Sequence, residues 1–349
     1  MSARSPLHTV DAALLAWLRG SPLWRDLPLT TRAQLRWKSH WATLNRRLSD
    51  ARVASAPALA PPLFIVGPWR SGTTVMHELL TALTGLPTPQ TWQCMNASSF
   101  MLLPPPAQTQ AVARPMDGLE ISALSPQEDE FALLTLGVDS VYRAFLMPER
   151  LAELQHTLTP AYWDAQAADW LPRFERFMAG VLHTTGRAGE RLILKSPNHS
   201  FRLPALLKRF PGAQVVWMVR DGADVLHSNR KMWQAMFAEH SLTASTTEAL
   251  DGVLGAALEG CAGVLQGLSD TPSLAGRWVP CRHADLVADP RSTVAAVVQQ
   301  LGLQRKDEAA LDLALARAGR GRIEHYDRPV PAAAQAGVTA LDRAQARIG

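Results

Sequence analysis

The sequence predicts an α/β fold in which a parallel sheet is flanked by helices and preceded by an N-terminal helical extension. Two observations carry this prediction. Short apolar runs of the kind that fill buried parallel strands recur along the chain. Each run is followed by a loop and then by a segment with apolar residues at helical spacing. Alternation of buried strands with helices is typical of a parallel sheet that is covered on both faces.

The first 60 residues are expected to be helical. Between residues 10 and 52, Leu, Ala and Trp alternate with Arg and Asp at helical spacing. The apolar positions include Leu35, Trp37, Trp41, Leu44 and Leu48. The Ala- and Pro-rich run 55–62 then ends the helix. We therefore expect a helical extension (1–60), a main domain (61–330) and a C-terminal tail (331–349) in which no function can be recognised.

Four apolar runs are candidate strands of the sheet. The first, at 63–66, leads into a Gly-containing loop and a helix that begins near residue 75. The others lie at 192–194, 213–219 and 278–279, and a helix at 293–301 is expected to pack behind the last. Between residues 90 and 126 the chain is Pro-rich and has no clear period, which is typical of an active-site loop or lid.

Composition bounds the class of protein. The chain has 349 residues, of which 47% are hydrophobic and 19% charged, and no segment approaches the roughly 20 apolar residues that span a bilayer. We interpret residues 1–20 as an amphipathic helix and not a signal peptide. The three cysteines are widely spaced and odd in number, so they indicate neither a disulfide framework nor a metal cluster. This pattern favours a reducing cytoplasm.

The charge balance favours an anionic ligand. The formal net charge is +4, and most of the 35 basic residues are arginines, whose guanidinium groups suit phosphate and sulfate. The excess is too small and too dispersed to indicate a nucleic-acid partner.

The loop after the first strand has the features of a phosphate site. A Gly-containing turn between a buried strand and a helix surrounds an anion with backbone N–H groups and the positive end of the helix dipole. Gly67 and Gly72 have the five-residue spacing of a nucleoside-triphosphate loop, but Thr73 stands where that loop carries Lys. We expect a single phosphate here, held by backbone N–H groups and by hydroxyls, with Arg70 supplying positive charge. The hydroxyls are those of Ser71, Thr73 and Thr74.

This loop resembles a motif of the sulfotransferase family. Residues 68–74, Pro-Trp-Arg-Ser-Gly-Thr-Thr, are similar to the P-[RK]-S-G-T-T loop that binds the 5′-phosphosulfate, with Trp69 inserted. Arg220, at the end of the third apolar run, and Ser228, eight residues later, resemble the pair that binds the 3′-phosphate. Arg220 is also expected at the carboxyl end of a strand, where ligands of open α/β sheets gather. A surface ion pair with Asp221 or Asp224 is the alternative role for Arg220.

Two further segments extend the resemblance, in the expected order. Residues 194–199 are similar to the K-S-P-x-H segment of bacterial sulfotransferases, and residues 283–290 to their Y-E-D-L-x-x-D-P segment, from which His283 and Ala284 depart. The resemblance implies a P-loop-like sulfotransferase fold and the donor 3′-phosphoadenosine 5′-phosphosulfate, with no metal. It also implies an acceptor hydroxyl or amine on a small molecule, lipid or glycan.

Sulfuryl transfer needs positive charge at the leaving phosphate oxygen and a base for the acceptor proton. Arg70 and Lys195 are the candidates for the charge. The candidate bases are His199, Glu128 and Glu130. The two glutamates lie in the segment 125–131, which resembles a P-x-E-D-E segment of the family.

The same segment has a second interpretation, as a helix N-terminus with Ser125 as N-cap and Pro126 as the first helical residue. Where many relatives carry a Glu base shortly after the first helix, this chain has Gln90 and Gln93. Glutamine is a poor proton acceptor, so either the base has moved or the acceptor loses its proton easily. His77 is expected to pack or to face solvent.

Two other functions stay open at this point. A P-loop kinase should have Lys after Gly72 and an Asp-ended strand for magnesium, and neither is evident. A non-catalytic nucleotide-binding protein on the same fold is the other. Aromatic and apolar residues form either an acceptor pocket or part of the core: Trp69, Trp92, Phe100, Met101 and the prolines 104–106. Arginines at 317, 320 and 322 form either a loop over the 3′-phosphate or a disordered basic stretch.

Overall fold

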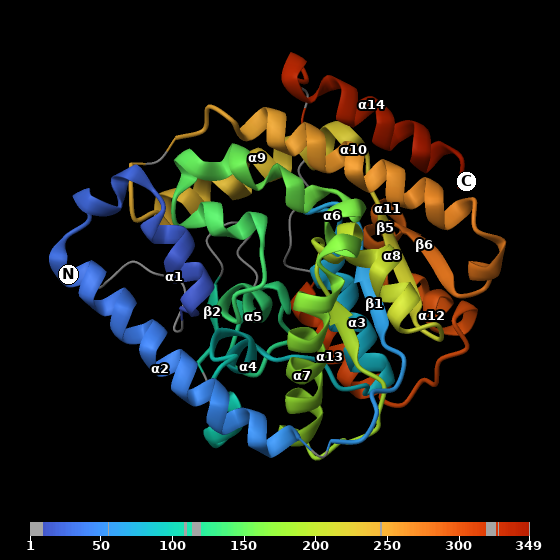
Figure 1. Cartoon of the computed structure of the whole chain (residues 1–349). Helices are drawn as coiled ribbons and strands as arrows, with labels where there is room; N and C mark the ends of the chain where they lie inside the picture. The colour runs from blue at the N-terminus through green and yellow to red at the C-terminus, as the bar shows by residue number, and fades with distance from the viewer. Residues whose placement is uncertain are drawn as a thin grey trace.

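A four-stranded parallel sheet lies at the centre of the chain (Figure 1). The structure is a computed structural model that describes residues 10–54, 56–107, 110–113, 120–244, 246–318, 326 and 328–348. The strand order is β4-β1-β5-β6, and every neighbouring pair is parallel. The strands are β1 (Leu63–Val66), β4 (Ile193–Lys195), β5 (Gln214–Val219) and β6 (Trp278–Arg282). All four candidate strands are therefore confirmed, with ends that move by one to three residues.

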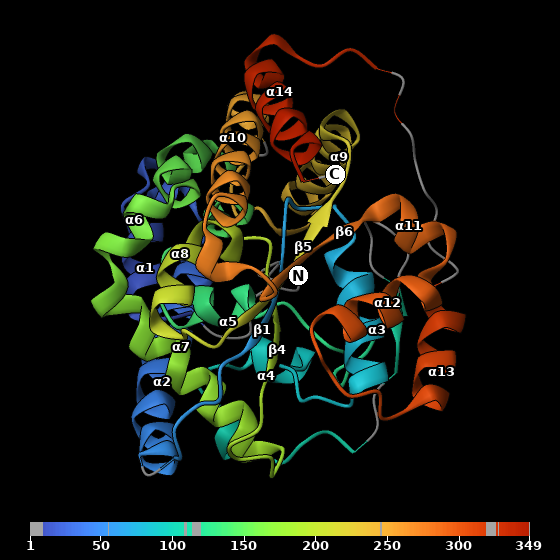
Figure 2. The same cartoon turned by 90° about the vertical axis from the view of Figure 1, so that its right-hand side faces the viewer.

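Helices cover both faces of this sheet (Figure 2). Side chains alternate along β1, so that Leu63 and Ile65 enter one core while Phe64 and Val66 enter the other. The smaller core packs against α3 (Thr73–Thr84), α12 (Pro290–Gln300) and α13 (Glu308–Ala318). The larger core packs against helices that include α7 (Ala167–Thr184), α8 (His199–Arg209), α9 (Gly222–His240) and α10 (Leu250–Ser269). This layering confirms the predicted fold class.

The described residues form further helices and a second, small sheet. The remaining α-helices are α1 (Ala12–Arg19), α2 (Leu29–Val53), α4 (Thr91–Met95), α5 (Glu130–Thr135), α6 (Pro160–Ala165), α11 (His283–Ala288) and α14 (Ala332–Ala346). The 3-10 helices are η1 (Pro22–Asp26), η2 (Phe100–Leu102), η3 (Val141–Phe145), η4 (Pro148–Leu158) and η5 (Pro272–Leu274). A two-stranded antiparallel hairpin consists of β2 (Val112–Ala113) and β3 (Glu120–Ile121).

The N-terminal helices form as the periodicity indicates and join the larger core. Leu14, Leu18 and Leu35 are buried in it, and α2 packs against α7 and η2. Four of the five apolar positions noted on α2 do not take part, because their side chains are exposed; they are Trp37, Trp41, Leu44 and Leu48.

The C-terminal tail contains a helix that packs on the main domain. In Figure 1, α14 lies along α10 at the top of the molecule. Gly337 allows this close approach, since a Cβ there would lie 2.0 Å from the carbonyl oxygen of Gly255. The residues of α10 have the length and mean hydropathy of a membrane span, which corrects the expectation that no segment approaches one. In the structure 56% of that stretch is buried inside the protein, as in a core helix.

The Pro-rich region 90–126 contains α4, η2 and the small hairpin, apart from residues 108–109 and 114–119, which lie outside the described residues. Gln90 and Gln93 form a reciprocal capping box at the start of α4. The side chain of Gln93 also donates to Thr184 Oγ1 at 2.9 Å. These two glutamines therefore have structural roles here.

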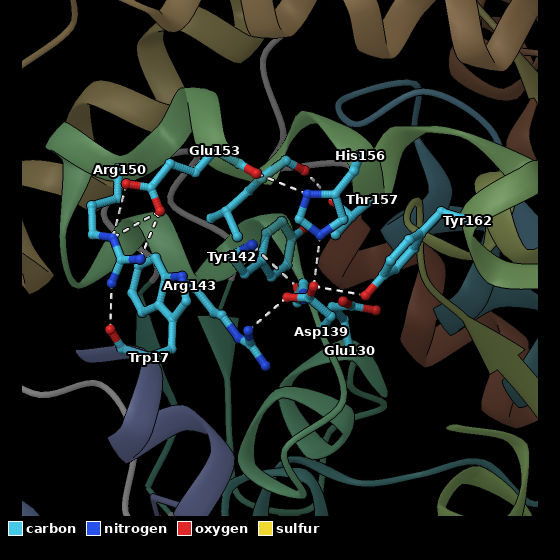
Figure 3. A network of polar contacts seen from close by, with 12 residues as sticks. Trp17, Glu130, Asp139, Tyr142, Arg143, Arg150, Glu153, His156, Thr157 and Tyr162 are labelled. Atoms are coloured by element: carbon cyan, nitrogen blue, oxygen red, sulfur yellow. Dashed lines mark hydrogen bonds and ion pairs between the residues drawn. The ribbon is translucent and has the colours of Figure 1, made fainter. Parts of the chain in front are cut away.

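A polar network centred on Asp139 ties η3, η4 and α6 together (Figure 3). Its carboxylate accepts hydrogen bonds from His156 Nε2 at 2.7 Å and from Tyr162 at 2.9 Å, and it pairs with Arg143 at 2.7 Å. Burial by itself raises the pKa of Asp139, but Arg143 and these hydrogen bonds outweigh it, so the pKa lies below its ordinary value. The network therefore stabilises the fold only while this carboxyl is ionised.

The lowered pKa of Asp139 predicts a specific acid sensitivity. The stabilisation is complete above the unfolded pKa of about 3.9 and is lost as the pH falls through the lower folded pKa. We expect Asp139→Asn to unfold roughly 1–3 kcal/mol more easily at neutral pH and to lose less further stability below about pH 4 than the native chain. Thermal unfolding across pH measures both effects. Asp169→Asn, which removes an exposed ion pair with Arg173, is the control and should change neither. Parallel pH profiles for the native and Asp139→Asn proteins would contradict the assignment.

Candidate active site

The loop from Gly67 to Thr74 joins β1 to α3 in the conformation that an anion site requires. Gly67 has φ +133°, and a Cβ there would lie 2.7 Å from the carbonyl oxygen of Met218 on β5. The hydroxyl of Ser200 on α8 accepts a hydrogen bond from Gly67 N at 2.9 Å and donates to Gly67 O at 3.1 Å. The start of the loop is therefore fixed to both neighbouring elements, and only glycine fits it.

The second half of the loop opens the N-terminus of α3. Arg70 and Gly72 both have left-handed backbone conformations, with φ of 67° and 96°. Such alternation turns successive N–H groups toward one side. Gly72 is the N-cap of α3 and offers no side-chain acceptor to the first N–H groups of the helix, which begins at Thr73. Thr73 is buried and Thr74 is half-buried.

Ser71 contributes to the shape of the loop. Its hydroxyl donates to Pro68 O at 2.7 Å, and its backbone N–H donates to the same oxygen at 3.2 Å. The side chain is fully buried. Both of its donors are thus used within the turn, whereas the sequence led us to expect the hydroxyl at the phosphate.

The two expected phosphate segments meet at Arg70. Its Nε donates to Ser228 Oγ on α9 at 3.1 Å, and its carbonyl oxygen accepts a hydrogen bond from Arg220 Nη1 at 2.7 Å. Arg220 follows β5, so it lies at the carboxyl end of the sheet beside the loop after β1. Burial lowers the pKa of Arg220 from its ordinary value, and although Asp224 opposes this, the charge of Arg70 lowers it further. Two cations in one partly buried place favour an anion between them.

The C-terminal helix holds the backbone of the Arg220 segment. Gln345 on α14 accepts from Arg220 N at 2.9 Å and donates to Arg220 O at 3.0 Å. Asp342, also on α14, accepts from Gly222 N at 2.9 Å. Three backbone groups at the start of α9 are therefore bonded to the end of the chain.

Three consecutive acidic residues are paired with three basic residues from the end of β4 and the start of α8. The pairs are Glu128 with Lys195, Asp129 with His199, and Glu130 with Arg202. Lys195 ends β4, His199 begins α8, and Arg202 lies one turn later on that helix. A single ladder of acid–base pairs therefore docks the segment 128–130 onto the strand and helix beside the loop from Gly67 to Thr74.

Burial differs along this ladder. Both members of the Asp129 and Glu130 pairs have fully buried side chains, whereas the side chains of Glu128 and Lys195 are 10% and 4% exposed. Burial alone raises the pKa of Glu130, but Arg202 outweighs it and holds that pKa below its ordinary value. The pair at Glu128 is thus the one nearest to solvent.

Glu128 is held by three donors. Tyr142 donates to Oε1 at 2.9 Å, Lys195 donates to Oε2 at 3.1 Å, and Ser196 donates to Oε1 at 3.3 Å. Burial and then the charge of Glu128 raise the pKa of Tyr142 well above its ordinary value, so the phenol keeps its proton and remains a donor. Strand register places Lys195 opposite Ile65 of β1, two residues before the loop begins.

His199 lies deeper in the protein. Its Nε2 is 2.8 Å from Asp129 Oδ2, its Nδ1 faces the Arg202 guanidinium at 3.5 Å, and its ring lies between Phe64 and Phe174. A guanidinium can only donate, so both ring nitrogens have partners inside the core. Burial, and then the charge of Lys195, lower the pKa of His77 well below its usual value, and its ring is packed against Thr88 as a core histidine.

The helix that begins within this acidic segment, α5, starts later than one interpretation of the sequence predicts. It begins at Glu130, so Ser125 is not its N-cap and Pro126 is not its first residue. The reason is that the backbone of 125–127 pairs with residues 89–91 instead. Thr91 N donates to Ser125 O at 3.0 Å, and Gln127 N donates to Pro89 O at 2.9 Å.

Four of the apolar residues considered for an acceptor pocket are core residues, whereas Pro104 and Pro105 are exposed. Trp69, Trp92, Phe100 and Met101 are all buried in the larger core. Of the C-terminal arginines, Arg317 lies on α13, and residues 319–325 fall outside the described residues.

Sequence reasoning missed Tyr142, Ser200 and the two α14 residues. Of these, Ser200 lies next to a motif, directly after the K-S-P-x-H segment. Tyr142 and the two α14 residues lie far from any motif.

Comparison with known proteins agrees with this geometry. A model of the sulfotransferase family matches residues 61–307. The omega-hydroxy-beta-dihydromenaquinone-9 sulfotransferases Stf3 of Mycobacterium bovis and Mycobacterium tuberculosis are each 31% identical to the chain over 259 residues, which is 72% of this chain and 65% of theirs. The match thus spans less than two thirds of these relatives' length.

Two solved structures share the fold. Sulfotransferase STF1 from Mycobacterium tuberculosis superposes with a TM-score of 0.61 at 20% identity, over 96% of this chain and 90% of that one. Sulfotransferase STF9 from Mycobacterium avium gives a TM-score of 0.66 at 20% identity, over 97% and 93%. Because the family model spans well over half of the chain and includes the whole loop from Gly67 to Thr74, the chain belongs to the sulfotransferase family.

Proposed function

We propose that this sulfotransferase moves a sulfuryl group from 3′-phosphoadenosine 5′-phosphosulfate to a hydroxyl group of a lipid-like acceptor. The observation that carries the choice of donor is the meeting of Arg70, Arg220 and Ser228 at the carboxyl ends of β1 and β5. A donor with phosphates at both its 5′ and 3′ positions needs two adjacent anion sites. The α3 N-terminus supplies the first, and the Arg220 and Ser228 side chains supply the second.

The chemistry requires one bond to form as another breaks. The acceptor oxygen attacks sulfur, the bond from sulfur to the 5′-phosphate oxygen breaks, and adenosine 3′,5′-bisphosphate leaves with that electron pair. Lys195 and the first N–H groups of α3 offset the charge that develops on the leaving oxygen. Arg70 donates a hydrogen bond from Nε to Ser228 Oγ, so its guanidinium lies beside the proposed 3′-phosphate site. We therefore assign Arg70 to binding the 3′-phosphate as well as the 5′-phosphosulfate. The transfer itself needs no metal in this scheme.

Access selects the base. Of the three candidates, Glu130 and His199 have fully buried side chains and charged partners, whereas Glu128 retains some exposure beside Lys195. We therefore assign proton acceptance to Glu128, and we assign Glu130 and His199 to positioning the segment that carries it.

The acceptor class rests on the relatives. The name of the Stf3 enzymes describes an acceptor with a hydroxyl at the end of a menaquinone chain. We propose an acceptor of the same general kind, an apolar molecule with a terminal hydroxyl.

A cytoplasmic location is also part of the proposal. It is supported by three cysteines that are all free and buried.

The transfer is tested with labelled donor and a panel of hydroxy-lipids, sugars and amines, scored by the mass gain of one sulfuryl group. Native protein should modify a hydroxy-lipid. Glu128→Gln should lower kcat at least about 100-fold, because it removes the base while retaining a group of the same size. It should still bind adenosine 3′,5′-bisphosphate. Glu153→Gln, at an exposed ion pair, is the matched control. Activity of Glu128→Gln within about threefold of native would remove the assignment.

Donor selectivity tests the second phosphate site. Without magnesium, native protein should bind adenosine 3′,5′-bisphosphate more tightly than AMP in calorimetry. Arg220→Ala should weaken bisphosphate binding about 10- to 100-fold and leave AMP binding nearly unchanged, since only the 3′-phosphate loses a charged partner. Arg209→Ala, at a surface pair with Glu175, should have no effect. If native protein binds both nucleotides equally, the donor assignment is wrong.

The contact of α14 with Arg220 is expected to be functional. Gln345→Ala should weaken bisphosphate binding by a smaller factor than Arg220→Ala, about three- to tenfold, because the backbone of Arg220 loses two hydrogen bonds while its charge remains. The ratio of bisphosphate to AMP affinity is the measurement. Arg343→Ala, at an exposed position on the same helix, should leave the ratio unchanged. An equal loss of both affinities for Gln345→Ala would point to general destabilisation instead.

A further inference from the structure

The long helix α2 exposes a row of large apolar side chains. Trp37 is 64% exposed, Trp41 42%, Leu44 39% and Leu48 53%. Their spacing of four, three and four residues is that of one helix face. The indole rings of Trp37 and Trp41 touch edge to face, with centroids 5.5 Å apart. We call these four residues the α2 row. Large apolar side chains gathered in this way usually mark a contact surface.

The row lies on the side of α2 that faces away from the protein. Leu35, Ala42 and Ser49 are buried on another side of the helix, about 130° away at 100° per residue. Figure 1 shows α2 running along one edge of the molecule, at the lower left. The helix therefore has two apolar faces, and folding uses only one of them.

Positive charge borders the row on both sides. At 100° per residue, Arg36 and Arg47 lie on one flank and Lys38 and Arg52 on the other. The helix carries six Lys or Arg residues and a single acid, Asp50. Asp50 is paired with Arg176 on α7, and Arg46, which lies on the side of α2 that faces the core, is paired with Asp11. An apolar stripe with Trp and Leu between basic borders is the pattern of a helix that lies in a membrane interface.

We propose that α2 docks this sulfotransferase onto an anionic lipid surface, with the α2 row inserted among the acyl chains and the flanking basic residues at the headgroups. Trp favours this boundary because its ring is apolar and its N–H is polar. The charges favour anionic over zwitterionic lipid. A second copy of the chain fits less well, because a two-fold contact through α2 would bring the same basic borders together.

This surface is separate from the donor site and goes beyond the proposed function. None of its residues contacts Arg70, Glu128 or Arg220 in the hydrogen bonds and ion pairs of the described residues. The docking proposal does not depend on the identity of the acceptor, and its test does not use transfer activity.

Sedimentation with vesicles tests the proposal. Full-length protein is mixed with vesicles of phosphatidylcholine alone, or with about one third phosphatidylglycerol. We expect binding to the anionic vesicles that falls with rising salt. The variant Trp37→Ser, Trp41→Ser, Leu44→Ser, Leu48→Ser should bind them at least about tenfold more weakly. Arg36→Glu with Arg47→Glu should lose the preference for anionic lipid.

Two controls separate docking from folding. Leu313→Ser with Val287→Ser removes exposed apolar side chains of α13 and α11 and should bind vesicles like native protein. Every variant should keep the native melting temperature and bisphosphate affinity, which report the fold and the donor site. The proposal is overturned if native protein ignores anionic vesicles, or if the α2 variant binds them equally. It is also overturned if the row instead mediates a concentration-dependent dimer that does not bind vesicles.

Discussion

The ladder of acid–base pairs between segment 128–130 and residues Lys195, His199 and Arg202 is the constraint on which the proposed site depends. Charges that are removed from water are costly unless each finds a well-placed partner. The Glu130–Arg202 and Asp129–His199 pairs meet that requirement in the dry interior. They therefore fix the rung at the edge, where Glu128 and Lys195 stand beside the phosphate loop. The Glu128–Lys195 pair is the one nearest to solvent, which is why we propose it for chemistry and the two deeper pairs for structure.

The proposed donor site is assembled from segments that lie far apart in the sequence. Arg70 is held in a left-handed conformation by the loop after β1, and its carbonyl receives Arg220 from the end of β5. Parallel strands bring their carboxyl ends to one edge of a sheet, so loops far apart in sequence become neighbours there. The helix α14 then bonds to the Arg220 backbone from the outside. Helix α14 thereby supports the backbone that carries the Arg220 side chain.

The N-terminal helix α2 shows how folding and surface chemistry separate within one element. Leu35 and Ala42 are buried where the helix meets the rest of the protein, and the Asp50–Arg176 pair ties it to α7. The exposed Trp37 and Leu48 add nothing to that packing, and a soluble surface gains nothing from them. Their presence between arginines is explained by a contact outside the chain. An enzyme that acts on a lipid-like acceptor would benefit from such a surface, although the two proposals stand on different residues.

Local patterns in the sequence determined the strands at 63–66 and 214–219, the glycine loop after the first, and the family resemblance through Arg70, Lys195 and Arg220. These features depend on neighbours within a few residues, so they can be predicted without the fold. Three others could not. The choice of Glu128 over Glu130 and His199 depends on burial, which distant helices decide. Ser71 faces Pro68 because the turn closes on itself. The partners of Arg220 on α14 lie about 125 residues away. Such contacts have no local signature, and only the tertiary structure decides them.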